Sequence, residues 1–131
     1  MSQIFIVLAG LLGALSVALG AFAAHGLQAS LSERSLEVFK TAVHYQFMHT
    51  IALFVLGVWL SQQALGNWGT AVGVSWLIGI LLFSGSLYWL SLGGPRWLGP
   101  VTPLGGLSFI IGWLLLAVAA WRVAGSATNS G

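Results

Sequence analysis

The sequence predicts an all-α integral membrane four-helix bundle, with an amphipathic extension at the start of its second helix. Of the 131 residues, 58% are hydrophobic and 5% are charged, and the mean hydropathy is +0.98. This composition is typical of several membrane-spanning helices. Four of the six charged side chains lie between Glu33 and Lys40, which leaves long uncharged stretches elsewhere. We expect one membrane domain over residues 1–123 and a flexible tail over residues 124–131.

The residue types that are missing exclude several functions. The chain has no cysteine, which removes disulfides, thiolate metal sites and thiol catalysis. Its four cations form no Lys/Arg run, so we expect no nucleic-acid binding. Aspartate, H-E-x-x-H and G-x-x-x-x-G-K are all absent, which argues against metalloprotease, Ser-His-Asp and phosphate-loop chemistry. We expect a non-enzymatic protein without catalytic residues; an intramembrane hydrolase that uses serine and histidine alone stays open.

The first predicted span covers residues 4–24. It ends in Ala21-Phe22-Ala23, which resembles a signal-peptidase site, but no positive region precedes it. Its apolar run of about 20 residues is also longer than the ~7–15 of a signal peptide, so we expect a retained helix. Rows of small residues let membrane helices approach closely, and they predict that this helix is central in the bundle. Simple tolerance of glycine and alanine in membrane helices is the alternative. The two rows are Gly10, Ala14 and Ala18, and Ser16, Gly20 and Ala24.

The second helix is predicted to begin near Ser30-Leu31-Ser32-Glu33, which has the S-x-x-E form of a capping box. Residues 31–41 form an amphipathic helical segment, and residues 42–62 form the second span. An uninterrupted helix over both would be roughly 48 Å long, against a hydrocarbon core of ~30 Å. We therefore expect the amphipathic segment to project from the membrane or to bend along its surface.

Two further spans are predicted over residues 68–92 and 103–122. Gly93-Gly94-Pro95 ends the third, and Thr102-Pro103 starts the fourth as N-cap and first helical residue. Tryptophans near the span ends are typical of interfacial belts, whereas two others fall inside spans and are predicted to pack. The belts are Trp59, Trp68 and Trp121 at one end and Trp89 and Trp97 at the other, and the internal pair is Trp76 and Trp113.

The distribution of positive charge predicts an orientation. Arg34, Lys40 and Arg96 lie on the side of the first and third loops, and Arg122 lies on the other side. Because cytoplasmic loops carry the excess of Lys and Arg, we expect both termini to lie outside the cytoplasm.

Four stretches of the sequence resemble a known family. They are Gly20-Ala21-Phe22-Ala23-Ala24-His25-Gly26-Leu27, the stretch from Phe39 through Ala42, Tyr45, Gln46 and His49, then Gly85-Ser86-Leu87-Tyr88, and Thr102-Pro103-Leu104-Gly105-Gly106. In this order they resemble the small four-span membrane proteins of domain of unknown function 423, which include bacterial inner-membrane proteins and transmembrane protein 256 homologues. The resemblance implies four helices and a multi-pass location in the bacterial inner membrane. It implies no substrate, because the family has no established activity.

Polar side chains within or beside the spans form the candidate functional cluster. Ionisable groups at membrane depth are costly unless they are paired, so they normally face protein or water. We expect His49 to be hydrogen-bonded to a neighbouring helix, through His25 or the segment 84–88. We expect Gly85 to offer a close-packing notch, with a ligand-binding notch as the alternative. The cluster consists of His25, Glu37, Lys40, His44, Tyr45, Gln46, His49, Ser84, Ser86 and Tyr88.

A metal or haem site is not expected in this cluster. His44 and His49 lie about 140° apart around a helix, so a straight helix cannot direct both at one ion. A metal or haem site would require His25 to lie beside His44 or His49. The chain has no aspartate or cysteine to add to these imidazoles as ligands, so the sequence gives little support for such a site. We therefore expect no metal and no cofactor.

Three functions remain open. The leading hypothesis is an accessory, assembly or scaffold protein whose segment 31–41 meets lipid headgroups, another membrane protein or a second copy. An oligomeric transporter or channel would use Glu37, His44, Tyr45 and His49, and a lipid- or quinone-binding protein would use Tyr45, Gln46 and His49. A water-filled cavity between helices two and three would favour transport, a lateral groove open to lipid would favour ligand binding, and a dry packed bundle would favour the scaffold.

Overall fold

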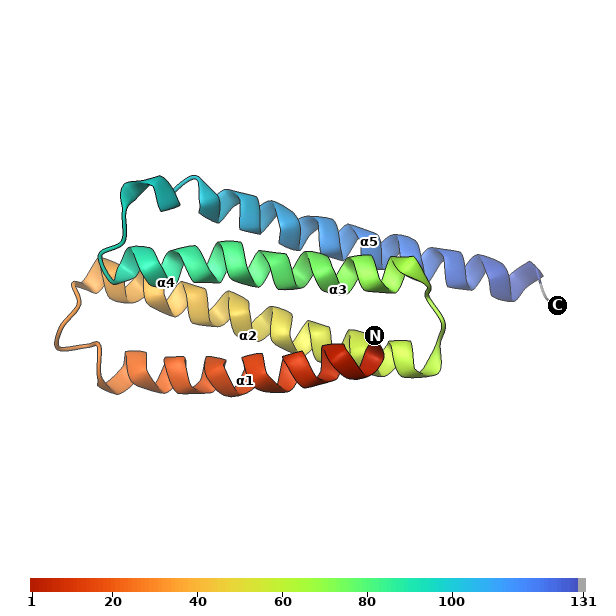
Figure 1. Cartoon of the computed structure of the whole chain (residues 1–131), viewed down its shortest axis with the longest axis horizontal. Coiled ribbons are helices and arrows are strands. Elements are labelled where there is room, and N and C mark those ends of the chain that lie inside the picture. The colour runs from red at the N-terminus through yellow and green to blue at the C-terminus, as the bar shows by residue number, and fades with distance from the viewer. Residues whose placement is uncertain (130–131) are drawn as a thin grey trace.

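The computed structural model describes residues 1–129 as helices joined by short loops (Figure 1). The elements are α1 (Ser2–His25), α2 (Glu33–Gln62), α3 (Asn67–Gly79), the π-helical turn η1 (Ile80–Ser84), α4 (Gly85–Ser91), the 3₁₀ turn η2 (Arg96–Leu98) and α5 (Val101–Asn129). Four stretches are long and apolar enough to cross a membrane: Ser2–His25, Glu33–Gln62, Asn67–Ser91 and Arg96–Asn129. The predicted all-α fold with four spanning helices is confirmed.

Helix α2 begins with a different cap from the one predicted. The Ser32 hydroxyl accepts a hydrogen bond from the Ser35 backbone N–H at 3.1 Å, so Ser32 is the N-cap. Ser30 lies in the preceding turn, where its own N–H and that of Leu31 donate to the carbonyl of Leu27. The capping box predicted from Ser30 is therefore wrong by two residues.

Helix α2 is continuous, and its charged first half is part of the bundle. This half packs along α1 and α4, and Phe39 is buried between Leu27 and Ala23. The predicted bend along the membrane surface is therefore not seen. The charged side chains of this half point outward and are exposed.

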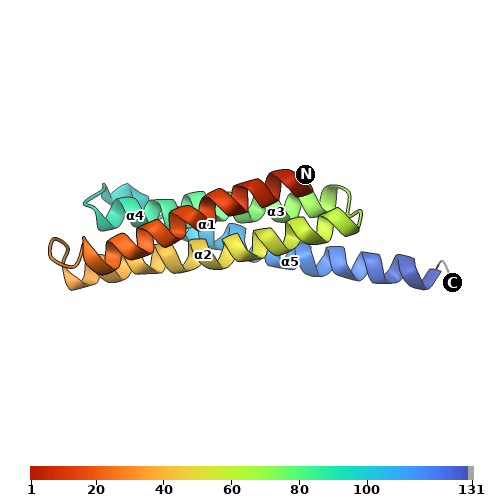
Figure 2. The same cartoon turned by 90° about the horizontal axis from the view of Figure 1, so that it is seen from below.

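The helices pack mainly in chain order, from α1 to α2, then to the rod made of α3, η1 and α4, and then to α5. Helices α1 and α5 lie at opposite edges of the bundle (Figures 1 and 2). The prediction that the first helix is central is wrong: Gly10, Ala14 and Ala18 are all exposed. Small residues permit a close approach, and α1 uses this freedom mainly on α2, where a Cβ added to Gly13 would lie 3.5 Å from Thr50 and one added to Gly20 would lie 3.5 Å from Val43.

The π-helical turn η1 is the point where α5 comes closest to the rod. A Cβ added to Gly105 would overlap the backbone of Leu82 and Phe83. Gly85, by contrast, has nothing nearer than 4.0 Å to an added Cβ, so the predicted close-packing notch at Gly85 is wrong. The close approach lies on the facing helix instead, at a glycine without a side chain to separate the backbones.

Helix α5 begins and ends outside the predicted limits of the fourth span. It begins at Val101, so Thr102 lies in the first turn rather than at the N-cap. It continues to Asn129 and extends past the other helices (Figure 2). Residues 124–129 of the predicted flexible tail are therefore helical, and residues 130–131 lie outside the described residues.

Candidate functional site

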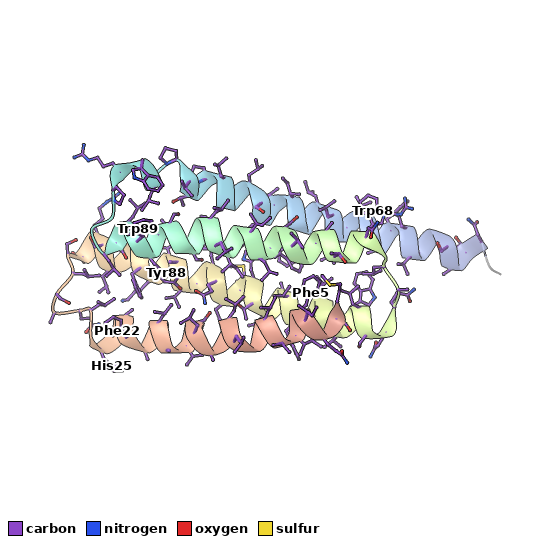
Figure 3. The ribbon with its side chains drawn as sticks, viewed as in Figure 1. Phe5, Phe22, His25, Trp68, Tyr88 and Trp89 are labelled. Carbon is purple, nitrogen blue, oxygen red and sulfur yellow. The ribbon has the colours of Figure 1, made fainter. Side chains whose placement is uncertain are left out.

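The ten residues of the predicted cluster do not form one site. Five lie between the helices: Gln46, His49, Ser84 and Ser86 are buried, and Tyr88 is half-buried. Four others are exposed on the outside of α1 and α2: His25, Glu37, Lys40 and His44. Tyr45 is partly exposed, and its ring lies against Phe83 of η1, with centroids 4.6 Å apart. In Figure 3, His25 lies at the outer end of α1, whereas Tyr88 points toward the middle of the bundle. The buried group therefore has to be considered separately.

Gln46 links three helices. Its Oε1 atom accepts a hydrogen bond from the Tyr88 hydroxyl at 2.6 Å, and its Nε2 atom donates to the carbonyl of Leu12 at 3.1 Å. Because Gln46 is 1% exposed, both bonds are shielded from water and lipid. The side chain joins α2 to α4 on one side and to α1 on the other, which fixes the register of these helices.

His49 links α2 to α5. Its Nε2 atom accepts a hydrogen bond from the Trp113 indole N–H at 3.0 Å, and its Nδ1 atom lies 2.9 Å from the carbonyl oxygen of Tyr45. An indole can only donate and a carbonyl can only accept, so His49 is a neutral imidazole with its proton on Nδ1. Phe109 stacks on the ring, with centroids 3.6 Å apart. The predicted bond to a neighbouring helix is confirmed, but the predicted partners, His25 and the segment 84–88, are wrong.

Ser84 and Ser86 each form a hydrogen bond to a neighbouring helix. The Ser84 hydroxyl donates to the carbonyl of Ala42 on α2 at 2.8 Å, and the Ser86 and Thr102 hydroxyls bond each other at 2.6 Å. Among residues 1–129, these hydroxyls bond neither His49 nor another histidine. In the described part of the chain, neither Ser84 nor Ser86 is therefore paired with an imidazole. No group of three or more histidine, aspartate or glutamate side chains in this part of the chain could hold a metal.

An apolar groove opens between α2 and α5, and sequence reasoning missed it. Its volume is about 450 Å³, and its floor and walls are hydrocarbon and indole. Trp76 of α3 forms part of the floor, with its ring 4.7 Å from that of Trp113 between centroids. Trp113, predicted to pack inside its span, is half-exposed along one wall. The groove is lined by Ala52, Val55, Leu56, Trp59, Trp76, Trp113, Leu116 and Ala120.

A second, more polar hollow lies one turn further along α5. Its volume is about 280 Å³, and it lies between α5 and the loop that joins α2 to α3. The Arg122 guanidinium lies 5.2 Å from the centroid of the Trp68 ring, within cation–π distance. Figure 3 shows Trp68 at the end of the bundle opposite to His25 and Trp89. The remaining lining residues include Gln63, Leu65, Val123 and Ser126.

Comparison with known proteins identifies the family of this chain. Residues 19–106 match the model of the family described as "Protein of unknown function (DUF423)". The chain belongs to the DUF423 family. It is 43% identical over 126 residues to the UPF0382 membrane protein SAB0533 of Staphylococcus aureus (strain bovine RF122 / ET3-1), covering 94% of this chain and 99% of that protein. No solved structure matches the chain.

Two further relatives show the same extent of likeness. The UPF0382 membrane protein YwdK of Bacillus subtilis (strain 168) is 42% identical over 120 residues, which cover 90% of this chain and 96% of YwdK. A UPF0382 membrane protein of Haemophilus influenzae is 44% identical over 122 residues, which cover 93% and 97%. The chain is therefore a membrane protein of an uncharacterised family, as its sequence predicts.

The DUF423 match covers most of the interhelical contacts described above. It includes Gln46, His49, Tyr88 and the glycine at the close approach, Gly105. It ends before Trp113 and Arg122, so the α5 side of both hollows lies beyond it. Sequence reasoning selected the polar residues of the match because their chemistry stands out in an apolar helix. The groove residues give no such signal, because each is an ordinary apolar side chain of a membrane span.

Proposed function

We propose that this DUF423 protein is a non-enzymatic membrane protein that binds a lipid hydrocarbon chain in the groove between α2 and α5. The observation that carries this proposal is the groove itself, which is open to the side and lined entirely by apolar and indole groups. The groove has a volume of about 450 Å³, and a group the size of a water molecule occupies ~30 Å³, so the groove has room for about 15 groups of that size. That capacity suits one extended hydrocarbon chain.

The polar interior supports a non-enzymatic role. Each ring nitrogen of His49 and each polar end of Gln46 is engaged by a neighbouring helix or by its own backbone. A catalytic group must be free to exchange protons or bonds with a substrate. These side chains instead form hydrogen bonds between helices. Such bonds help helices to associate in lipid, where the hydrophobic effect does not drive association.

The same contacts argue against a transport route through one copy of the chain. A polar route would require ionisable side chains that face a common water-filled space. Glu37, Lys40 and His44 are exposed on the outer side of α2, away from the buried His49. The large hollow beside His49 is apolar.

Photolabelling with a lipid tests the proposal. The full-length protein in detergent micelles is exposed to a phosphatidylcholine that carries a diazirine on its acyl chain, and labelled peptides are mapped by mass spectrometry. We expect label to concentrate in residues 52–59 and 113–120. Ala120→Phe should fill the groove and remove this label, whereas Ala14→Phe, the same change at an exposed alanine of α1, should leave it unchanged. Label spread evenly over exposed residues such as Leu11 and Leu15 would refute lipid binding in the groove.

A scaffold role is a second candidate, supported by the exposed charged side chains at the start of α2. Glu33, Arg34, Glu37 and Lys40 offer both signs of charge to a partner protein, a second copy or lipid headgroups. Co-purification in mild detergent should then lose one specific partner when these four side chains are replaced by glutamine. Retention of all partners would argue against this role.

We also propose a location in the bacterial inner membrane with both termini outside the cytoplasm. The support is the excess of positive side chains at the end of the bundle that holds Arg34, Lys40 and Arg96. A C-terminal reporter fusion that is active only in the cytoplasm would reverse this orientation.

A further inference from the structure

We infer that the hydrocarbon chain in the α2–α5 groove belongs to an anionic phospholipid whose phosphate binds Arg122. This inference rests on the proposed function and adds the chemical class of the ligand and the residue that selects it. The polar hollow beside Arg122 is the headgroup subsite, and the apolar groove is the chain subsite.

The two hollows follow one another along the same walls. On α2, the groove is lined up to Trp59, and the polar hollow begins at the C-cap residue Gln63, which follows the end of the helix. On α5, the groove is lined by Leu116 and Ala120, and the polar hollow by Ala119, Arg122 and Val123. The lining therefore changes from apolar to polar toward the end of the helices. An amphiphile with one apolar chain and one polar head has this same order of surfaces.

Arg122 gives the headgroup subsite its charge preference. Glu33 and Glu37, the two acidic side chains of the protein, are at the start of α2, and Arg34, Lys40 and Arg96 lie at that same end of the bundle. Among residues 1–129, Arg122 is thus the only charged side chain at the other end. Its guanidinium is placed over the Trp68 ring, and its planar set of donors matches phosphate oxygens.

The same charge distribution argues against a second copy of the chain as the occupant. A second copy in the same membrane orientation would present its own Arg122 or uncharged side chains at this depth, because both acidic residues lie at the opposite end. It would therefore leave the cation unpaired. An anionic lipid headgroup neutralises it from the membrane surface, where each basic side chain attracts anionic lipid.

Competition for the photolabel tests the inference. The diazirine phosphatidylcholine is displaced from the full-length protein by phosphatidylglycerol or by phosphatidylcholine with matched acyl chains. We expect phosphatidylglycerol to displace the label at about fivefold lower concentration, the preference that one interfacial cation provides. Arg122→Gln should abolish this difference. Arg122→Lys should keep it, and so should Arg96→Gln, the matched loss of one arginine at the opposite end.

The outcomes separate this inference from the function on which it rests. Label in the groove with equal displacement by the two lipids would overturn the anionic ligand and leave chain binding intact. Loss of the preference in Arg96→Gln as well as in Arg122→Gln would also overturn it, because any cation would then serve. Absence of label from the groove would overturn both. Should Arg122→Gln fail to fold, judged by tryptophan fluorescence, folded Arg122→Lys decides the matter. A retained preference would support selection by a cation at this position, and a lost preference would overturn it.

Discussion

The bond between Gln46 and Tyr88 should be measurable as a coupling energy across the bundle. Gln46→Leu removes the acceptor of the Tyr88 hydroxyl and the donor to the Leu12 carbonyl. Tyr88→Phe removes the hydroxyl alone. If the 2.6 Å bond stabilises the fold, the double variant should lose less stability than the two single variants added together.

The structure sets the size of each effect. Interhelical hydrogen bonds in membranes average ~0.6 kcal/mol and reach ~1.7 kcal/mol. Gln46→Leu removes two of them and leaves the Tyr88 hydroxyl without a partner, so we expect a loss of about 2 kcal/mol. The Leu12 carbonyl is not orphaned, because it also accepts from the Ser16 hydroxyl. Tyr88→Phe should cost about 1 kcal/mol, with a coupling energy of ~0.6–1.7 kcal/mol between the two sites.

Equilibrium unfolding in mixed micelles, followed by tryptophan fluorescence, measures these free energies. Gln62→Leu is the matched control, because it makes the same chemical change at an exposed glutamine at the end of α2. We expect that variant to stay within about 0.5 kcal/mol of the parent protein. A coupling energy below ~0.3 kcal/mol between Gln46 and Tyr88 would show that the two changes add independently, and would refute a stabilising role for this bond.

Three further predictions follow from the packing. Gly105→Ala should destabilise the fold by about 3 kcal/mol, because its Cβ would overlap the backbone of η1. Gly106→Ala should be neutral or stabilising, because its Cβ meets the Phe83 ring at 3.8 Å. Equal unfolding midpoints of the two variants in mixed micelles would contradict the close approach at Gly105. The free energy of unfolding of Ala14→Leu should stay within about 0.5 kcal/mol of the parent protein in the same assay, because Ala14 is exposed. A larger loss of stability would indicate that α1 lies in the interior of the bundle. Trp113→Phe should cost about 1 kcal/mol and also weaken photolabelling of the groove, whereas Gln46→Leu should lower stability alone.

The number and type of helices could be predicted because lipid imposes them. Long apolar runs must form spanning helices, and glycine marks the turns: Gly66 has φ +57° and Gly93 has φ +95°, a left-handed backbone that other residues avoid. The neighbours of each helix could not be predicted in this way. The small residues of α1 show which surface can pack closely, but not that α2 is the main neighbour that uses it.

The candidate site was predictable in its residue types and not in its pairs. Gln46, His49 and Tyr88 stand out because polar groups in lipid need partners. The partner of His49 is Trp113, 64 residues away, and that pairing depends on the register of α5 against α2. Register is set by three-dimensional packing around Gly105 and Phe109, which no local pattern encodes. The ring of Trp113 was therefore predicted to pack, while the acceptor of its N–H was not foreseen.

Four of the hydrogen bonds between helices converge on α2, and their positions explain why a groove persists beside it. Leu12 of α1, Ser84 of η1, Tyr88 of α4 and Trp113 of α5 each bond to a group on α2. The bond from Trp113 joins α2 and α5 at the middle of α2, at His49. Toward Trp59 and Arg122 the two helices are lined by apolar side chains, and apolar surfaces gain little by meeting each other in lipid. Closing the groove would therefore bring little free energy, whereas the proposed lipid chain would fill it at the entropic cost of ordering that chain.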